Sequence, residues 1–236
     1  MARVTLTGPA LEGLVVEDPA ASIRLLLPLP GAEELVLPAW TGNEFLLADG
    51  RRPTLRTFTP RRVDTSALEV DVDVVVHGAG AASAWAAAVE PGAPAALSGP
   101  GRGHRVDAGA GSYLLLGDET AIAAISQLLE TLGADSAVRV HLESDGDPLP
   151  LPPHPRAEVT WHHRAGGAPF GAALVGAAAA AAPAGHVWAA GEAAAMQQLR
   201  RLLFDERGLP RARATVRGYW KAGRSADDGA GSDPEP

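Results

Sequence analysis

Residues 55–62, which read LRTFTPRR, group three arginines with one aromatic ring and two threonines. On a β-strand, Arg56 and Phe58 would share one face and Thr57 and Thr59 the other, because successive side chains point to opposite sides. Such a strand presents different chemistry on its two faces, and the grouped donors favour a binding surface. An ordinary strand with surface arginines is the alternative.

A second candidate site follows a β run that ends at His77 and Gly78. The next residues, AGAASAWAAAV, indicate a short helix entered through small residues, with Ser83 near its first turn. A glycine-rich approach to a helix start exposes backbone N–H groups and the positive end of the helix dipole, which suits a phosphate group. As alternatives, Trp85 could be a core residue and His77 a structural histidine.

The sequence GDETAI places Asp118 and Glu119 at the start of a predicted helix, where a dinucleotide-binding fold has its phosphate loop. The pattern G-x-G-x-x-G is absent there, and negative charge at this point would repel a pyrophosphate. Thr120 and the backbone remain candidate contacts. We therefore expect a dinucleotide to bind weakly or slightly off the usual position.

Two further groups are candidates for contacting the same nucleotide. Glu143, Ser144 and Asp145 follow a predicted strand at the ribose-reading position, where a carboxylate such as Asp145 favours NADH and repels the extra phosphate of NADPH. Gly191 and Glu192 repeat the arrangement of strand, glycine and helix. A capped helix start explains Gly191 and Glu192 equally well.

The histidines show no metal-ligand spacing. His162 and His163 are adjacent, so on a strand their side chains point to opposite faces and cannot bind one metal together. We therefore expect no protein-bound metal. The sequence also lacks a G-x-S-x-G motif and a convincing carboxylate pair, which argues against a hydrolase.

The composition favours a folded chain of two domains. Of its 236 residues, 46% are hydrophobic and 20% charged, and no apolar run is long enough to cross a bilayer. A net charge of −8 argues against nucleic-acid binding. No cysteine is present, so redox chemistry would need a bound organic cofactor. The first residues lack the regions of a signal peptide, so we expect a cytoplasmic protein. We also expect a monomer that has no membrane partner.

Short β runs broken by proline and glycine occupy residues 1–108. They are RVTLTG (3–8), GLVVED (13–18), SIRLLLP (22–28), LRTFTP (55–60), ALEVDVDVVVHG (67–78) and AALSGP (95–100). Apolar and acidic residues alternate in the fifth run, which is typical of a half-solvated antiparallel sheet, and a closed barrel would remove exposed edges. We predict an N-terminal antiparallel Greek-key β-barrel.

Residues 109–224 alternate strands with helices, which indicates parallel strands with helical crossovers. The predicted strands are 113–118, 138–143, 158–163, 186–191 and 214–220, and the predicted helices are 119–133, 177–182 and 192–208. These elements predict a C-terminal parallel-sheet nucleotide-binding α/β domain. Residues 225–236 are polar and acidic without apolar anchors, so we expect a disordered tail.

A barrel followed by such a domain is the plan of ferredoxin-reductase-like flavoproteins. LRTFTPRRVD and VDVVVHGAGAASAWA resemble the R-x-Y-T and H-G-x-G-P-A-S-x-W-A elements of the siderophore-interacting protein family, the FAD-dependent ferric-siderophore reductases. GDET, WAAGEA and RGYWKAG resemble further elements of that family, in the same order. The resemblance covers nearly the whole chain. Phe58 stands where the family usually has Tyr, and Ala81 where it has Pro.

The resemblance implies that FAD binds the first domain and that NADPH or NADH supplies electrons through the second. Arg56 would bind the flavin diphosphate, Phe58 would pack against the ring system, and Thr59 would hydrogen-bond near the reactive flavin nitrogen. The cofactor-binding residues are then Arg56, Thr57, Phe58, Thr59, His77, Gly78, Ala82, Ser83, Trp85, Thr120, Asp145, Gly191, Glu192 and Trp220. The family is usually described as using NADPH, so Asp145 leaves the choice of nucleotide open.

The implied substrate is a ferric siderophore. Lys221 is the candidate for attracting an anionic ferric complex, because ligands gather at the carboxyl ends of strands, and a solvated lysine is the alternative. Arg224, Arg62 and Arg102 are candidate helpers. The predicted activity is electron transfer from NAD(P)H through FAD to ferric iron, which releases Fe²⁺ and needs no catalytic side chain. A non-catalytic flavin or siderophore carrier and a general flavin reductase serving a partner protein are the alternatives.

Overall fold

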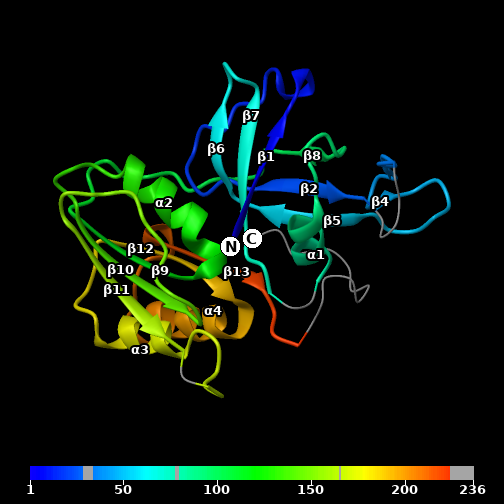
Figure 1. Cartoon of the computed structure of the whole chain (residues 1–236). Helices are drawn as coiled ribbons and strands as arrows, with labels where there is room; N and C mark the ends of the chain where they lie inside the picture. The colour runs from blue at the N-terminus through cyan, green and yellow to red at the C-terminus, as the bar shows by residue number, and fades with distance from the viewer. Residues whose placement is uncertain (29–33, 78–79, 165, 224–236) are drawn as a thin grey trace. The chain divides into compact units, whose positions relative to one another are not determined.

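A computed structural model describes residues 1–28, 34–77, 80–164 and 166–223. The chain forms two compact units, of which the first ends at Gly103 and the second begins at His104 (Figure 1). Within the described ranges, no helix is both long enough and apolar enough to cross a membrane. The acidic tail expected at 225–236 lies outside the described residues.

The first unit is built from antiparallel strands. One sheet has the order β1-β7-β6, with β1 at Ala2–Thr7, β7 at Glu69–Val74 and β6 at Pro60–Asp64. A second sheet has the order β5-β2-β8, with β5 at Thr54–Phe58, β2 at Ile23–Leu27 and β8 at Ala96–Ser98. The remaining elements are β3 (Ala39–Trp40), which pairs with β4 (Phe45–Leu46), a 3-10 turn (Pro9–Leu11) and α1 (Ala81–Ala88).

The core of the first unit joins its two larger sheets. Ile23 of β2 packs with Val70, Val72 and Val74 of β7, and these four side chains are at most 1% exposed. Partly buried neighbours from the other elements complete the cluster: Leu6, Leu11, Leu14, Phe58, Val63, Ala82, Ala86 and Leu97. The apolar face predicted for this strand is therefore confirmed within β7, whereas Asp71 on the other face is only 7% exposed and Val76, beyond the end of the strand, is 43% exposed.

The second unit contains a five-stranded sheet in the order β11-β10-β9-β12-β13, and every pairing in it is parallel. The strands are β9 (Ser112–Asp118), β10 (Ala137–Ser144), β11 (Ala157–His163), β12 (His186–Glu192) and β13 (Ala214–Trp220). The helices are α2 (Ile122–Thr131) after a 3-10 turn (Glu119–Ala121), α3 (Ala172–Ala180), and α4 (Ala193–Arg200), which continues as a π-helix (Arg201–Glu206); a last 3-10 turn covers Arg211–Arg213.

Helices cover both faces of this sheet. Figure 1 shows α2 on one face and α3 and α4 on the other. Leu174 of α3 and Met196 of α4 pack against Leu116 of β9 and Ala189 of β12, and all four are fully buried. From β9 the chain first adds β10 and β11 on one side of the sheet, and it then crosses to add β12 and β13 on the other side. The direction of winding therefore reverses between β9 and β12. In open α/β sheets, ligands bind in the crevice at the carboxyl ends of the strands at such a switch point.

The predicted fold class, an antiparallel β part followed by a parallel α/β part, is confirmed. Two local expectations are wrong. Residues 13–18 form no strand, and of their apolar side chains Leu14 packs against the core while Val15 is 55% exposed. The small-residue helix expected at 177–182 runs from Ala172 to Ala180, and it ends there because the residues just before Pro183 disfavour the helical conformation.

Candidate functional site

The strand β5 places the first group of candidate residues. It pairs with β2 so that Arg56 lies opposite Leu25 and Phe58 opposite Ile23. Both partners are almost fully buried, so Arg56 and Phe58 share the inner face, as predicted, and both are half-buried. The Phe58 ring packs against the core of the first unit. The Arg56 Nη1 donates to the carbonyl oxygen of Leu55 at 2.9 Å.

The two threonines of this stretch do not share one environment, which differs from the expectation. Thr57 lies opposite Arg24 and is exposed. Thr59 is only 8% exposed, because β5 ends at Phe58 and the chain then enters β6, which belongs to the other sheet. The Thr57 hydroxyl therefore faces solvent and the Thr59 hydroxyl faces the protein interior.

The start of α1 carries the second group. Gly80 precedes it with φ +120°, a conformation that favours glycine, and among the described residues no side chain caps this helix start. The buried Ser83 hydroxyl donates to the carbonyl oxygen of Val75 and accepts from the N–H of His77, both at 3.2 Å. Ser83 thus ties the chain before α1 to the helix, and an anion here would meet backbone N–H groups.

The other residues of this group differ in exposure. Ala82 packs against the same core cluster as Phe58, whereas the His77 side chain is exposed. The Trp85 Nε1 is buried, and no acceptor for it lies among the described residues. Gly78, which was also predicted to contact the cofactor, lies outside the described residues.

In the second unit, three buried carboxylates occupy three helix starts. Asp118, at the end of β9, accepts from the Thr120 N–H at 2.9 Å and the Thr120 hydroxyl at 2.5 Å. Glu192, at the end of β12, accepts from the N–H groups of Ala194 and Ala195 at 2.6 and 3.0 Å. Asp118 is 6% exposed and Glu192 is 5% exposed. The 3-10 turn that leads into α2 and the start of α4 are therefore each capped by a carboxylate of the chain itself.

The third carboxylate comes from β10. Glu143 is 3% exposed and accepts from the N–H of Gly171 at 2.6 Å and of Ala173 at 3.1 Å, at the start of α3. The sequence marked Glu143 only as part of a ribose-reading group. Its role as a cap for a helix that begins 29 residues later was not visible, because the contact depends on the crossover that follows β11.

Asp118 also lies directly against Gly191, at the end of β12. A side chain at Gly191 would place its Cβ only 2.6 Å from the Asp118 Oδ2, so the glycine leaves room for this carboxylate. The Trp220 Nε1, at the end of β13, donates to the same oxygen at 2.7 Å. Burial raises the pKa of Asp118 to about 6, although hydrogen bonds from Thr120 and Trp220 oppose this rise.

Asp145 is exposed at the end of β10, but its carboxylate is paired with the Arg164 guanidinium. This hydrogen bond and the nearby charge raise the pKa of Arg164. The Asp145 N–H donates to the Glu119 Oε1 at 2.8 Å. Arg164 also lies 4.0 Å over the Phe170 ring, which meets Trp220 edge-on at 4.7 Å between ring centroids. Asp145 therefore does not present an unpaired carboxylate to a ribose.

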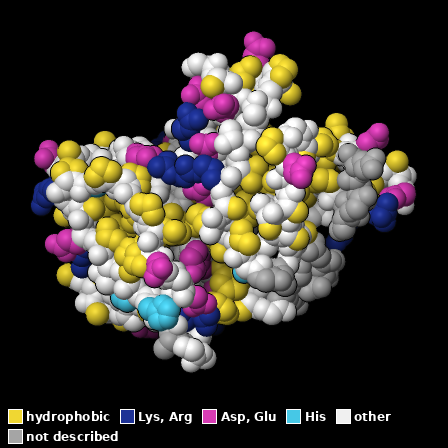
Figure 2. Space-filling view, viewed as in Figure 1, with side chains coloured by type: hydrophobic (Ala, Val, Ile, Leu, Met, Phe, Trp, Pro, Cys, Tyr) yellow, Lys and Arg dark blue, Asp and Glu magenta, His cyan; other side chains and the backbone are white. Residues whose placement is uncertain are grey.

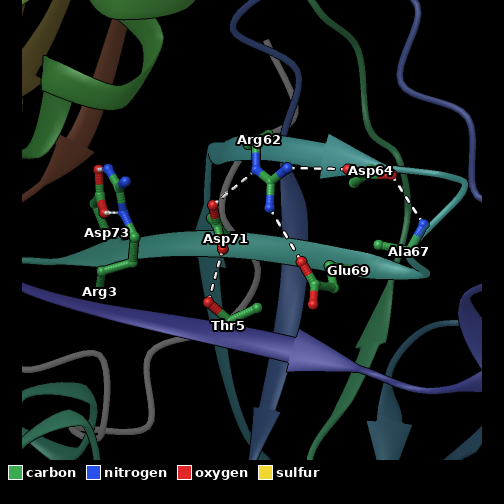
Figure 3. A network of polar contacts seen from close by, with 8 residues as sticks. All are labelled: Arg3, Thr5, Arg62, Asp64, Ala67, Glu69, Asp71 and Asp73. Carbon is green, nitrogen blue, oxygen red and sulfur yellow. Dashed lines mark hydrogen bonds and ion pairs between the residues drawn. The ribbon is translucent and has the colours of Figure 1, made fainter.

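Of the four candidate substrate contacts, Lys221 and Arg102 are exposed, and Arg224 lies outside the described residues. The Arg62 guanidinium contacts three carboxylates, those of Asp64, Glu69 and Asp71, at 3.0 to 3.1 Å (Figure 3). Figure 2 shows basic and acidic side chains together over β6 and β7. The charge of Arg62 is therefore already matched within the first unit, which gives no support to a role for Arg62 in substrate binding.

One histidine contact was missed in the sequence. His141 of β10 and His162 of β11 lie on adjacent strands, with their Nδ1 and Nε2 atoms 3.1 Å apart and their rings stacked. Burial, and then the charge of His162, lower the pKa of His141. Among the described residues, no group of three or more potential ligands is arranged to hold a metal ion. The partner strand of β10 could not be predicted from local pattern alone.

The chain is similar to several known proteins. An uncharacterized protein of Mycobacterium tuberculosis is 37% identical over 96% of this chain and 87% of its own length. Mycobactin import ATP-binding/permease protein IrtA of the same species is 32% identical over 99% of this chain, which spans 26% of that protein. Ferric vibriobactin reductase ViuB of Vibrio cholerae is 32% identical over 61% of this chain and 53% of its own length.

Solved structures show the same fold. The siderophore utilization protein from T. fusca has a TM-score of 0.77 and 34% identity, with 94% of this chain and 87% of that chain covered. Phthalate dioxygenase reductase shares the fold at 17% identity and a TM-score of 0.57, over 95% of this chain and 65% of that chain. Residues 1–104 match the siderophore-interacting FAD-binding domain and residues 110–223 match the siderophore-interacting protein model. The chain therefore belongs to the siderophore-interacting protein family.

Proposed function

We propose that this chain is a flavin-dependent reductase that binds FAD in its first unit and passes electrons to the ferric iron of a siderophore, which then releases Fe²⁺. The observation that carries the proposal is the start of α1, which is approached through Gly80 at φ +120° and has no side-chain cap among the described residues. It is the one α-helix start of the described residues not met by a buried carboxylate, and a diphosphate suits it.

Other residues of the first unit fit the same cofactor. Arg56 is half-buried on the inner face of β5, where a guanidinium can bind phosphate oxygens with two parallel hydrogen bonds. The buried Trp85 Nε1 has no acceptor among the described residues, so it is a donor to which a bound ligand can supply an acceptor. Phe58 offers an aromatic face at the same strand, although its ring already packs against the core.

FAD, when bound, supplies the electrons, and the chain supplies binding and orientation. Reduction weakens the hold of hard oxygen ligands on iron, so Fe²⁺ can leave the siderophore. The exposed ammonium of Lys221 is the proposed attractant for an anionic ferric complex. The reductase name of ViuB and the import function named for IrtA support iron siderophores as substrates. We place the reaction in the cytoplasm, where the cell can use the Fe²⁺.

The proposed electron donor is NADPH or NADH. Here the second unit fits less well, because Asp118, Glu143 and Glu192 cap the helix starts at which a pyrophosphate would bind. This observation favours a second candidate function, a flavin or siderophore carrier that does not accept electrons from a nucleotide. A flavin reductase that serves a partner protein is the third.

An anaerobic assay distinguishes these functions. The protein with bound FAD is mixed with NADPH or NADH, a panel of ferric siderophores and a dye that traps Fe²⁺, and we expect the dye to develop colour. In a parallel sample the flavin is reduced first and the excess reductant is removed by gel filtration. Siderophore binding without Fe²⁺ in both samples would identify a carrier. Colour only in the second sample would show that the donor is not a nicotinamide nucleotide.

A further inference from the structure

The outer strand of the second sheet, β11, is open to solvent along its free edge. It stands at the end of the order β11-β10-β9-β12-β13, so only its side toward β10 is paired (Figure 1). Strands of parallel sheets are usually buried on both faces, yet Glu158, Val159 and Thr160 in the middle of β11 are exposed, Val159 to 43%. An exposed edge of this kind can pair with a further strand.

The hydrogen bonds of β11 show which of its backbone groups face the free edge. The Val138 N–H of β10 donates to the Arg156 carbonyl at 3.0 Å. Because successive residues of a strand bond to opposite sides, the even-numbered residues from 156 to 164 bond to β10. The backbone groups that point outward, and make no hydrogen bond within the described ranges, are those of Val159, Trp161 and His163.

The opposite edge of the same sheet, β13, is protected in two ways. The Arg200 Nη2 donates to the Val216 carbonyl at 2.5 Å, and the pairing of β13 with β12 shifts register between Gly191 and Glu192. A basic side chain and an irregular pairing are both devices that keep an edge from pairing with another chain. β11 has neither, since it keeps one register with β10 and contains no proline, lysine or arginine.

The sequence of β11 is complementary to itself when two copies run antiparallel with Thr160 at the centre. In that register Val159 lies opposite Trp161 of the second copy, and their outward backbone groups exchange two hydrogen bonds. Glu158 lies opposite His162, and the two Thr160 side chains lie opposite each other. Aromatic with β-branched, threonine with threonine, and acidic with basic side chains are the cross-strand pairs that stabilise a sheet.

The histidine contact between β10 and β11 leaves His162 able to make this pair. Its Nε2 faces the His141 Nδ1 at 3.1 Å. The two nitrogens of an imidazole point away from each other, so the His162 Nδ1 is directed away from β10, toward the free edge. When the His141 N–H donates to Nε2, the neutral His162 carries its proton on Nδ1 and can donate it to a carboxylate. The Glu158 carboxylate makes no hydrogen bond or ion pair with any described residue.

We propose that two copies of this chain pair through the free edges of β11, antiparallel and centred on Thr160, so that their two five-stranded sheets become continuous. A two-fold axis passes between the two Thr160 residues, and every other contact is made twice. Registers displaced by one residue would set outward groups against groups that bond to β10, and registers displaced by two would separate Glu158 from His162.

The expected dimer is weak, because each copy contributes one strand of seven residues, about 23 Å long. An interface of this size belongs with transient complexes, so we expect a Kd on the order of 10–100 μM. The chain would then be a monomer, as the sequence led us to expect, at about 1 μM and below, and a dimer in concentrated solution. The proposal does not depend on FAD, a nucleotide or a siderophore.

Analytical ultracentrifugation of the full chain with bound FAD, from about 1 to about 500 μM, measures this Kd. Thr160→Lys sets two like charges opposite each other at the two-fold axis and should raise the Kd at least about threefold, and so should Thr160→Glu. An equimolar mixture of these two variants should pair about tenfold more tightly than either variant alone, because opposite charges then face each other. Thr160→Val keeps the branched shape without a charge, and this control should pair like the parent.

Hydrogen exchange locates the interface in the unaltered protein. The backbone N–H groups of Val159 and Trp161 should exchange about tenfold more slowly when nine chains in ten are paired than at about 1 μM, whereas those of Thr160 and His162 should be protected at both concentrations. A parent that stays monomeric at the highest concentration would overturn the proposal. So would a mixture of folded charge variants that pairs no better than either one alone, or pairing that leaves exchange at Val159 unchanged. None of these readings involves iron reduction, so a failure of the reductase assignment is recognised separately.

Discussion

Replacing Asp118 by Asn tests whether this carboxyl group titrates in the folded protein. The side chain is 6% exposed, and burial raises its pKa to about 6 from the ordinary value of 3.8. A raised pKa means that the folded state binds the proton more tightly than the unfolded state. The associated stability is therefore complete below the unfolded pKa and is lost as the pH rises through about 6.

The magnitude follows from the two pKa values. One pKa unit corresponds to about 1.4 kcal/mol, so ionisation of Asp118 costs about 3 kcal/mol of unfolding free energy once the pH is well above 6. Between about pH 5 and about pH 8 the loss is about 1.4 kcal/mol. Asn has the same size but does not ionise, so Asp118→Asn should gain about this much relative to the parent over that interval.

Urea unfolding followed by tryptophan fluorescence measures this difference, and Trp161, Trp188 and Trp220 all report on the second unit. A constant offset between the two proteins is expected, because the Asn amide cannot accept from both Thr120 and Trp220. Only the change of the offset with pH tests the reasoning. Glu158→Gln, which removes an exposed carboxylate of the same unit, is the control and should show no such change. An offset for Asp118→Asn that stays constant from pH 5 to pH 8 would refute the argument.

Three further predictions concern the first unit and the substrate. Arg56→Ala should weaken FAD binding about ten- to a hundredfold, since a charged hydrogen bond contributes roughly 1.5–3 kcal/mol, and the apoprotein should keep its circular dichroism; unfolding instead would indicate a purely structural role. Asp71→Asn should lower the unfolding free energy by about 1–2 kcal/mol near neutral pH, because it weakens the bonds from Thr5 and Arg62. Desolvation of Asp71 opposes ionisation, but these bonds outweigh it and lower the pKa of Asp71. The difference in unfolding free energy between parent and variant should therefore shrink as the pH falls through the pKa of Asp71 in the folded protein. Urea titrations at several pH values would show this. Lys221→Ala should raise the KM for anionic ferric siderophores severalfold at low salt and leave flavin reduction unchanged, and equal KM values for parent and variant would argue against an attracting role.

Local pattern was enough to predict most of the longer elements, because they obey short-range rules, but it did not predict β3, β4 or β6. The acidic and apolar residues of β7 alternate with a period of two, and Val70, Val72 and Val74 are buried as that period requires. The strands of the second unit are apolar runs followed by helical segments, which is enough to predict a parallel sheet. The strand expected at 13–18 failed because local apolar character does not show whether a partner strand is available.

The candidate site was predicted less well, because its contacts depend on which strands become neighbours. The sequence marked the carboxylates of GDET as unfavourable for a pyrophosphate, but it did not show that Trp220, 102 residues later, would bind one of them. The sequence predicted that Asp145 reads a ribose, yet Arg164, the residue that follows β11, pairs with its carboxylate. Arg62 has the right chemistry for an anionic ligand, yet it meets three carboxylates on β6 and β7.

The two units differ in how the N–H groups at their helix starts are satisfied. A helix start presents unpaired N–H groups and the positive end of the helix dipole, and either a ligand or the chain itself must satisfy them. In the second unit, Asp118, Glu143 and Glu192 do so from buried positions at the ends of three strands. At α1, no side chain among the described residues caps the helix start, and the Ser83 hydroxyl bonds to the backbone at Val75 and His77. Because a buried carboxylate binds these groups permanently and a ligand binds them reversibly, a tightly held diphosphate is expected only in the first unit.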